Sequence, residues 1–399
     1  MRILIASDTY VYQTSGASNM VIALARGLRA LGHDVRVLAP ADKRSSFREG
    51  DDFFLRSVPV ILYPDIRLCP ERSDPLLKEL AEWKPDIIHL HTEASMSRFA
   101  HRIAKETGAP LVMTAHTDWA QFFFGRFCRT GAVRVMMKTA GKRIYRGVDT
   151  VILPSEKARS FPQVQGFRGR EAVWVPNGIP LERYAKTITP EERAALYASV
   201  GLEDRGCTIV MITRVSREKN ILEILRYLPA LAEEVPEAQL VIAGDGPDRR
   251  HLERWCARHG VTDRVKFVGR IPPDEVYRYY AMGDLFVSAS TFEVHSLSCL
   301  EAMAVGLPMI CREDDSLRGV LEDGVNGFVY HTEEEFVSAV ARLTREADLR
   351  ASMHAASLER AQRFSLEEYV RQTMRVYEKV LAVKEEEEKE ASAEREGED

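Results

Sequence analysis

The feature that most constrains this chain is an alternation of short apolar runs with helix-length amphipathic segments. In the first half, five apolar runs have the length and flanking residues of buried strands: 2–7, 34–40, 86–91, 110–116 and 149–155. The segment 19–32 predicts a helix, because its large apolar residues recur at spacings of three and four and Gly32 follows as a stop signal. Alternating strands and helices predict parallel sheets covered on both faces.

The same alternation then starts again. Five further strand-like runs occupy 207–214, 238–246, 264–270, 284–290 and 307–312. Between the two series, residues 175–193 are rich in Pro, Gly and polar residues and predict a hinge. We therefore expect an α/β protein with two doubly wound, Rossmann-like parallel-sheet domains, whose ligands bind at the carboxyl ends of the strands across a cleft. The predicted divisions are 1–176, 177–364, a helix at 365–383 that either caps the second domain or packs back on the first, and a tail at 384–399.

The tail distorts the overall charge. Residues 384–399 hold nine acids and three bases, a net charge of −6, and the whole chain has −5, so the remainder is +1. Because the tail lacks large apolar residues, we expect it to be disordered and solvated, with a role in binding a partner left open. The near-neutral remainder does not favour nucleic acid as a partner.

The cysteines and the N-terminus indicate a cytoplasmic setting. None of the six cysteines forms a close C-x-x-C pair, and no histidine cluster accompanies them, which argues against a zinc site and a disulfide scaffold. The chain begins directly with a strand-like run, without an apolar signal region. No run approaches the roughly 18 apolar residues of a membrane span, so contact with a membrane is expected only from its surface.

The segment TFEVHSLSCLEAMAVGLP (291–308) holds two glutamates, Glu293 and Glu301, at the border of a loop and a helix. Apolar residues at 297, 300, 304 and 307 predict the buried face of that helix, with Glu301 at its edge. The helix N-terminus presents free N–H groups and suits a phosphate, while a carboxylate beside it can accept hydroxyl protons from a ribose or another sugar. The alternative is structural, since glutamates in a first turn simply complement the helix dipole.

Two other strand ends favour the same kind of ligand. TRVSREKN (213–220) places Arg214 and Lys219 on a loop that enters a helix, where paired cations suit a diphosphate, although a solvated basic turn is the alternative. In AGDGP (243–247), Gly244 marks a point where the backbone passes close to something, although such turns are common.

In the first half, His91 and His116 each follow a predicted strand, a position that is more often structural than catalytic.

The stretch 119–146 has seven bases and no acids. A basic amphipathic helix behind exposed aromatics suits an anionic membrane surface, or it packs on its own sheet. Its apolar helical face is expected to contain Val133, Met136, Met137, Ala140 and Ile144. The expected lipid-contacting and membrane-contacting residues are Trp119, Phe122, Phe123, Phe124, Arg126, Arg134, Lys138, Lys142 and Arg143.

Several of these motifs resemble a known family. TRVSREKN, VIAGDGP, FVGRIPPDEVYRYYAMGDLFVSAS, FEVHSLSCLEAMAVGLPMI and GVNGFV, in this order, resemble the nucleotide half of retaining glycosyltransferases with the GT-B fold, and above all family 4, whose hallmark is E-x7-E. The resemblance implies an acceptor domain followed by a nucleotide-sugar domain. In the second domain it assigns the diphosphate to Arg214 and Lys219, the ribose to Glu301, the donor sugar to Glu293 and the base to the backbone at Arg270 and Ile271.

The resemblance also implies that Gly16, in SDTYVYQTSGAS (7–18), belongs to a loop over the donor phosphates, and that His116 lies next to the transferred sugar. Ser296 and Leu297 then border the donor at the helix start. The chain departs from the family pattern at Asn220 and Ser296, where many members have glycine, and at Pro180, where aspartate is usual. Because no convincing D-x-D motif is present, we expect no obligatory metal and no other cofactor.

Within the family, SDTYVYQTSG, IIHLHTEAS, APLVMTAHTDW and CREDDSLRGVLEDGVNGF resemble the diacylglycerol glucosyltransferase branch. That branch transfers α-glucose from UDP-glucose to diacylglycerol at the inner membrane leaflet. The resemblance implies retention by front-face attack, with the leaving phosphate taking the acceptor proton and Glu293 binding rather than attacking. Another donor sugar, a soluble or polyprenyl-linked acceptor, or a non-catalytic sugar-nucleotide binding protein remain as alternatives.

Overall fold

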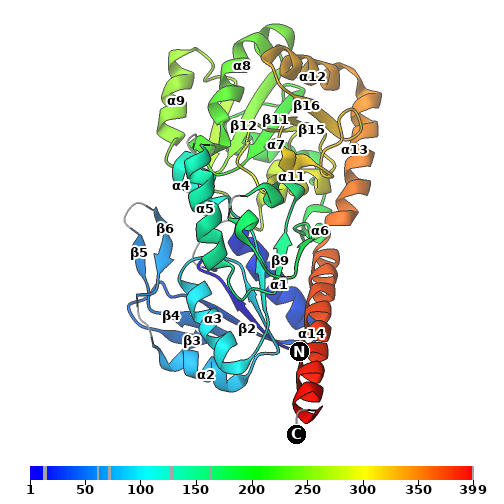
Figure 1. Ribbon diagram of the computed structural model, residues 1–399. Helices are drawn as coiled ribbons and strands as arrows, with labels where there is room; N and C mark the ends of the chain where they lie inside the picture. Colours follow the sequence, from blue (N-terminus) through cyan, green and yellow to red (C-terminus); the bar gives the residue numbers. More distant parts are fainter. Residues whose placement is uncertain (12–15, 61–62, 71–72, 126–129, 162, 398–399) are drawn as a thin grey trace. The chain divides into compact units, whose positions relative to one another are not determined.

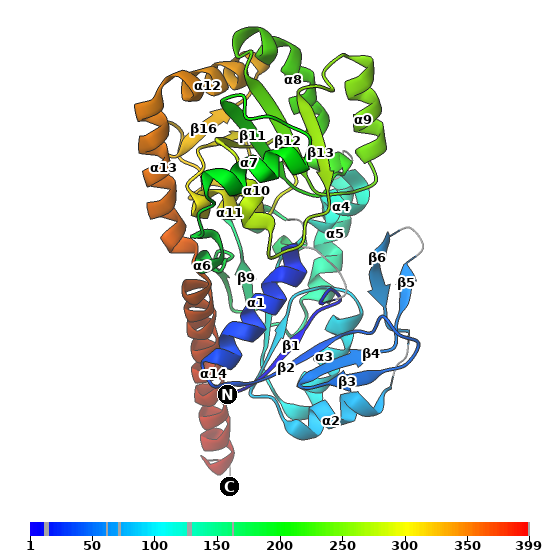
Figure 2. The same ribbon diagram turned by 180° about the vertical axis from the view of Figure 1, so that it is seen from behind.

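The computed structural model describes residues 1–11, 16–60, 63–70, 73–125, 130–161 and 163–397. The chain divides into two compact units. Unit 1 consists of Met1–Gly178 with Leu366–Asp399, and unit 2 of Ile179–Ser365. Each unit is built on a largely parallel sheet with helices packed against it, so the predicted α/β class is confirmed (Figures 1 and 2).

The sheet of unit 1 has the strand order β10-β9-β8-β7-β1-β2-β4-β3. All neighbouring pairs are parallel except β3 and β4, and β5 and β6 form a separate antiparallel pair. The strands are β1 (Arg2–Ala6), β2 (Asp34–Pro40), β3 (Phe47–Glu49), β4 (Asp52–Leu55), β5 (Val58–Val60), β6 (Tyr63–Leu68), β7 (Ile87–Leu90), β8 (Leu111–Thr114), β9 (Thr150–Leu153) and β10 (Glu171–Trp174). All five runs predicted in this half are strands.

Helices of unit 1 follow most of these strands. They are α1 (Gly16–Ala30), α2 (Pro75–Trp83), α3 (Ser95–Thr107), α4 (Trp119–Phe124), α5 (Gly131–Ile144) and the C-terminal α14 (Leu366–Gly397), with short 3-10 turns η2 (Glu156–Ser160) and η3 (Val164–Gly166). In both views α14 lies along α1 (Figures 1 and 2). The two helices are close: a Cβ atom at Gly27 would lie 2.5 Å from Cγ2 of Val370.

The end of the chain differs from the disorder expected for 384–399, because α14 continues to Gly397. Glu, Lys and Ala, which make up most of residues 384–399, are strong helix formers. Lys384 and Glu388 form an i,i+4 ion pair at 3.9 Å, and Glu387 pairs with Arg170 at 2.5 Å. Earlier in the same helix, Lys379 pairs with Glu171 at 2.5 Å. As far as Gly397, the acidic tail is therefore a continuation of α14, and Glu387 ties it to the rest of unit 1 through Arg170.

The sheet of unit 2 is entirely parallel, with the order β13-β12-β11-β14-β15-β16. Its strands are β11 (Cys207–Ile212), β12 (Ala238–Ala243), β13 (Val265–Gly269), β14 (Leu285–Ser288), β15 (Met309–Arg312) and β16 (Gly327–Tyr330). Its helices are α6 (Leu181–Tyr184), α7 (Pro190–Ser199), α8 (Ile221–Glu234), α9 (Arg249–Arg258), α10 (Val276–Ala281), α11 (Leu297–Val305), α12 (Glu333–Arg345) and α13 (Ala347–Ala361), with 3-10 turns η4 (Arg217–Lys219), η5 (Asp315–Leu317) and η6 (Gln362–Phe364).

Both faces of this second sheet are buried, as the continuous apolar runs require. Ile209 and Met211 of β11 enter a core shared with α8 and α12, while Val210, between them, enters the core formed with α10 and α11. The segment 175–193, predicted as a hinge, contains α6 and the start of α7. The latter begins with a capping box between Thr189 and Glu192.

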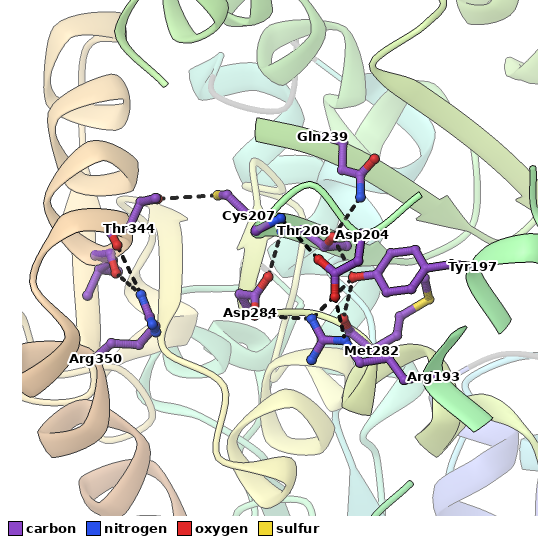
Figure 3. A network of polar contacts seen from close by, with 12 residues as sticks. Arg193, Tyr197, Asp204, Cys207, Thr208, Gln239, Met282, Asp284, Thr344 and Arg350 are labelled. Carbon is purple, nitrogen blue, oxygen red and sulfur yellow. Dashed lines mark hydrogen bonds and ion pairs between the residues drawn. The ribbon is translucent and has the colours of Figure 1, made fainter. Parts of the chain in front are cut away.

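A polar network joins α7 to the amino ends of β11 and β14 (Figure 3). The Thr208 hydroxyl lies 2.7 Å from the Tyr197 hydroxyl, and the Thr208 backbone N–H donates to Asp284 at 2.7 Å. Arg193 pairs with the same Asp284 at 3.3 Å. This end of the sheet is therefore closed by structural contacts, which leaves the opposite, carboxyl end for ligands.

No helix in the described part of the chain combines the length and apolarity that a membrane span requires. Of the six cysteines, Cys128 lies outside the described residues, and the other five are buried.

Candidate active site

The order of strands in unit 2 places a topological switch point between β11 and β14. From β11 the chain winds outward to β12 and β13, and it then returns to β14 on the other side of β11 and winds outward through β15 and β16. Loops at the carboxyl ends of two such strands diverge and leave a crevice in which parallel α/β sheets bind ligands. Arg214 and Lys219 follow β11, and Glu293 follows β14.

Lys219 and Glu293 meet at this point. The Lys219 ammonium donates a short hydrogen bond to Glu293 Oε1, and the two side chains are only 19% and 20% exposed. The cation predicted for the diphosphate and the carboxylate predicted for the sugar thus neutralise each other when no ligand is bound. Asn220, next to Lys219, has φ of +53°, a left-handed conformation that asparagine tolerates better than most residues.

The loop that bears Arg214 is supported by the glycine turn after β12. Gly244 has φ of +138°, and a Cβ atom there would lie 1.9 Å from the carbonyl oxygen of Thr213. A Cβ atom at Gly246 would lie 2.2 Å from the Val215 carbonyl oxygen. The backbone of the AGDGP turn, which was expected to pass close to another group, therefore packs against the loop that bears Arg214. Arg214 itself is exposed.

Glu301, in the second turn of α11, accepts a hydrogen bond from the Tyr280 hydroxyl at 2.8 Å. Burial raises the pKa of Glu301, and hydrogen bonds from Tyr184 and Tyr280 oppose that rise. Leu300 and Ala304 are buried beside it, as the spacing predicted, and Leu297 is partly buried. The hydrogen bond from Tyr280 thus fixes the orientation of the Glu301 carboxyl, which lies at the edge of the buried face of α11.

Ser296 begins α11 as its N-cap, and its hydroxyl accepts from the Cys299 N–H at 3.4 Å. This serine therefore stabilises the helix start. Arg270 is exposed and Ile271 is partly buried, directly after β13 at the same edge of the sheet. Gly269, just before them, accepts at its carbonyl oxygen from the Gly244 N–H at 2.8 Å, which joins the β12 and β13 ends.

Unit 1 has its own switch point, between β1 and β7. Asp8 follows β1, is buried, and receives the Ser95 hydroxyl at 2.6 Å and the Met96 N–H at 3.0 Å, so it holds the start of α3. Gly16, the first residue of α1, is exposed, and residues 12–15 of the predicted loop lie outside the described residues.

Three histidines lie together at the carboxyl ends of β7 and β8: His89 is in β7, and His91 and His116 follow the two strands. Nδ1 of His91 is 2.9 Å from Nε2 of His116, with the two rings stacked. His89 is buried between the Tyr377 hydroxyl of α14 and the Thr114 hydroxyl, each at 2.7 Å. Burial lowers the pKa of His89 to about 3 and of His116 to about 4, and lowers that of His91 as well. The cluster therefore consists of neutral imidazoles at neutral pH.

Glu93, two residues after His91, was not identified from the sequence. Burial raises its pKa to about 8, while Trp119 and Tyr145 act in the opposite direction. The Tyr145 hydroxyl donates to Glu93 Oε1 at 3.2 Å and connects this loop to the end of α5. A protonated carboxyl can both donate and accept a hydrogen bond. No local pattern distinguishes Glu93 from a surface glutamate, because its burial comes from packing against distant residues.

The aromatic and basic segment forms two helices, α4 and α5. Trp119 stacks on Phe123 at 5.3 Å between ring centroids and contacts Phe122 edge-on, and Phe123 is 54% exposed. Phe124 is partly buried. The bases Arg134, Lys138, Lys142 and Arg143 are exposed, and Arg126 lies outside the described residues.

The predicted apolar face of α5 needs one correction. Met137 is buried, but Met136 is 47% exposed, next to Val135 at 66%. Close backbone packing at Gly141 sets the rotation of α5 about its own axis, because a Cβ atom at Gly141 would lie 2.0 Å from the Gln163 carbonyl oxygen. Gly141 therefore faces inward and Met136 outward, which gives the exposed surface both apolar and basic side chains.

Comparison with known proteins relates both units to one group of enzymes. Residues 14–183 match the family model described as Glycosyltransferase Family 4, and residues 193–360 match that of Glycosyl transferases group 1. The chain is 30% identical over 346 residues to an alpha-monoglucosyldiacylglycerol synthase of Streptococcus pneumoniae, covering 85% of this chain and 77% of that protein. The chain belongs to the family 4 glycosyltransferases.

A second relative, the alpha-monoglucosyldiacylglycerol synthase of Acholeplasma laidlawii, is 29% identical over 359 residues, covering 88% of this chain and 89% of that protein. Among solved structures, Anabaena Alr3699/HepE in complex with UDP-glucose superposes with a TM-score of 0.74 at 19% identity, covering 95% of this chain and all of the other. The GT-B fold of this glycosyltransferase is thereby confirmed.

Proposed function

We propose that this glycosyltransferase transfers glucose from UDP-glucose to a diacylglycerol-type lipid at an anionic membrane surface, with retention of configuration and without a metal ion. The observation that most supports the chemistry is the Lys219–Glu293 pair at the switch point of the nucleotide unit, with Arg214 on the same loop. The names of the two relatives, which specify glucose and diacylglycerol, support the donor sugar and the acceptor.

In the proposed reaction, the bond between the anomeric carbon and the departing phosphate oxygen breaks while the acceptor hydroxyl oxygen forms a bond on the same face of the sugar. The leaving phosphate oxygen takes the acceptor proton, so no side-chain nucleophile is required. Arg214, Lys219 and the N–H groups at the start of α11 stabilise the charge that develops on the diphosphate. Each such contact typically contributes about 10² to 10³ in rate.

The proposed role of Glu293 is to hold sugar hydroxyls once the diphosphate has displaced it from Lys219. Glu301 then holds the ribose, with its carboxyl oriented by Tyr280. We assign the neutral imidazole of His116 to the transferred sugar, because a neutral ring can donate a hydrogen bond without repelling a developing positive charge at the anomeric carbon.

The exposed surface of α4 and α5 supports the membrane part of the proposal. It combines Phe123, Val135 and Met136 with the bases Lys138 and Lys142. Apolar side chains enter the headgroup boundary and each base contributes about 1 kcal/mol of attraction to anionic lipid. We accordingly propose a peripheral location on the inner face of the cell membrane.

The test is transfer of radiolabel from UDP-glucose, UDP-galactose and GDP-mannose to diacylglycerol in mixed micelles that contain anionic lipid and EDTA. Label from UDP-glucose in the organic phase supports the proposal. Donor hydrolysis without transfer rejects the lipid acceptor, transfer from another donor rejects glucose, and activity that EDTA abolishes rejects the metal-free mechanism.

A further inference from the structure

A cavity of about 580 Å³ lies at the C-terminal end of α5, between that helix and the segment before β10. Four cationic side chains line it, and we call it the basic pocket: Lys142, Arg146, Arg168 and Arg170. The helix dipole accounts for cations in the last turn of α5, but Arg168 and Arg170 belong to a different segment. The convergence of cations from two segments therefore needs another explanation.

One acid, Asp149, is among the residues that line the pocket. Its Oδ2 atom accepts from the Leu111 N–H at 2.9 Å, and its Oδ1 atom is 3.8 Å from Arg170 Nε. Asp149 thus holds the start of β8. Within the described part of the chain, the Lys142, Arg146 and Arg168 side chains form no ion pair, so the pocket keeps an excess of positive charge.

The chain itself supplies a carboxylate to one of the cations that line the pocket. Glu387 of α14 accepts from Arg170 Nη2 at 2.5 Å, although both side chains remain about half exposed, at 55% and 40%. The Arg170 hydrogen bond lowers the pKa of Glu387. Glu387 belongs to a run of four glutamates at 385–388. Arginine binds carboxylate and phosphate oxygens with the same planar set of donors, so a site that receives one can receive the other.

We propose that the basic pocket binds a phosphate group and that Glu387 competes with it as an internal carboxylate. The phosphate comes either from the headgroup of an anionic phospholipid or from free phosphate. The headgroup source rests on the proposed membrane function, whereas the phosphate chemistry stands without it.

The first test uses the full-length protein with Arg146→Gln and Arg168→Gln combined. The control combines Arg26→Gln and Lys105→Gln, which removes the same charge from exposed positions of α1 and α3. Binding is measured to phosphatidylcholine vesicles with and without phosphatidylglycerol. We expect the pocket variant to lose roughly fivefold per base, about 25-fold in all, on anionic vesicles. Equal losses in the pocket variant and the control would overturn the proposal.

The second test identifies the ligand chemistry. Sodium phosphate and sodium chloride are compared at equal ionic strength as competitors for the anionic vesicles. Stronger displacement of the unmodified protein by phosphate, absent in the pocket variant, supports a phosphate site, and equal displacement by both salts overturns it. Calorimetry with inorganic phosphate alone then separates the sources: binding indicates free phosphate, and phosphate recognition only at vesicles indicates the headgroup.

Glu387→Gln tests the internal competitor. This substitution should strengthen the binding of phosphate or of vesicles several-fold, because it removes the carboxylate that pairs with Arg170. Since the Glu387 side chain is exposed, the substitution should leave the fold unchanged. Unchanged or weaker binding would remove Glu387 from the proposal. None of these measurements depends on sugar transfer, so failure of the diacylglycerol assay and failure of the phosphate site are distinguishable.

Discussion

His91 Nδ1 and His116 Nε2 lie 2.9 Å apart in unit 1, with their rings nearly parallel at 18°. One of these nitrogens must carry the proton that the other accepts, so the tautomers of the two rings are linked. His89 packs against His91 with ring centroids 4.1 Å apart and is itself fixed by Tyr377 of α14. The orientation of His116 therefore depends on two further histidines and on the C-terminal helix.

The histidine pair predicts a pH dependence of stability. Burial lowers the pKa of His116 from 6.5 to about 4, so below pH 6.5 the unfolded chain binds a proton that the folded chain excludes. The stability contribution is present above pH 6.5 and is lost as the pH falls toward 4, by at most about 1.4 kcal/mol per pH unit. Urea unfolding at several pH values should show a shallower acid loss for His116→Gln than for the unmodified protein. Identical slopes would contradict the shift.

The Lys219–Glu293 ion pair predicts opposite effects on product binding and turnover. In Glu293→Gln the carboxylate no longer competes with the diphosphate for Lys219, so UDP should bind several-fold more tightly while sugar transfer falls by about 10² or more. Calorimetry with UDP and a transfer assay measure the two effects. Lys219→Met is the matched comparison and should weaken both. Weaker UDP binding in Glu293→Gln would show that the ion pair does not oppose the diphosphate.

Glu301→Ala should reduce the affinity for UDP roughly 10- to 100-fold, because hydrogen bonds to a charged group contribute about 1.5–3 kcal/mol. Tyr280→Phe removes one hydrogen bond to Glu301 and should produce a smaller loss through misorientation of the carboxyl. Affinities come from calorimetry, with circular dichroism as the check on folding. UDP affinity unchanged in Glu301→Ala would remove the ribose role.

Gly244→Ala should destabilise unit 2 by roughly 2–4 kcal/mol, because the added Cβ atom would meet the Thr213 carbonyl oxygen and the backbone would be strained at φ of +138°. Gly206→Ala is the control, with φ of +98° but no atom within 4 Å of the added Cβ, so it should cost only about 1 kcal/mol. Free energies of unfolding in urea measure the difference. Equal losses would show that crowding by the Arg214 loop is unimportant.

Charge reversal of Lys138, Lys142 and Arg143 to glutamate should release the protein from anionic vesicles, since the three bases together contribute about 3 kcal/mol of attraction. Flotation with phosphatidylglycerol vesicles measures the binding. Separately, Met136→Ser should weaken binding at high salt, where apolar contact dominates, whereas Met137→Ser should unfold α5, because that side chain is buried. Binding that survives charge reversal would mean that the basic surface is only structural.

The sequence by itself determined the ten strands that its apolar runs predicted, the buried face of α11, and the position of Glu293 before that helix and of Glu301 within it. These features depend on periodicity within about ten residues, which a local pattern records directly. The edge strands β3, β10 and β16, the neighbouring β4 and the separate β5–β6 pair were not predicted, because they are short and their stability comes from pairing with a neighbour rather than from their own apolar content.

Only the tertiary structure decided how the polar groups are paired. Lys219 and Glu293 are 74 residues apart, Glu93 and Tyr145 are 52 apart, and His89 and Tyr377 are 288 apart. Their protonation and orientation arise from burial against distant segments. The same holds for Met136, which faces outward because Gly141 packs on Gln163, and for the acidic tail, which extends α14 along unit 1. Local composition cannot encode such pairings, because each partner becomes a neighbour only when the chain has folded.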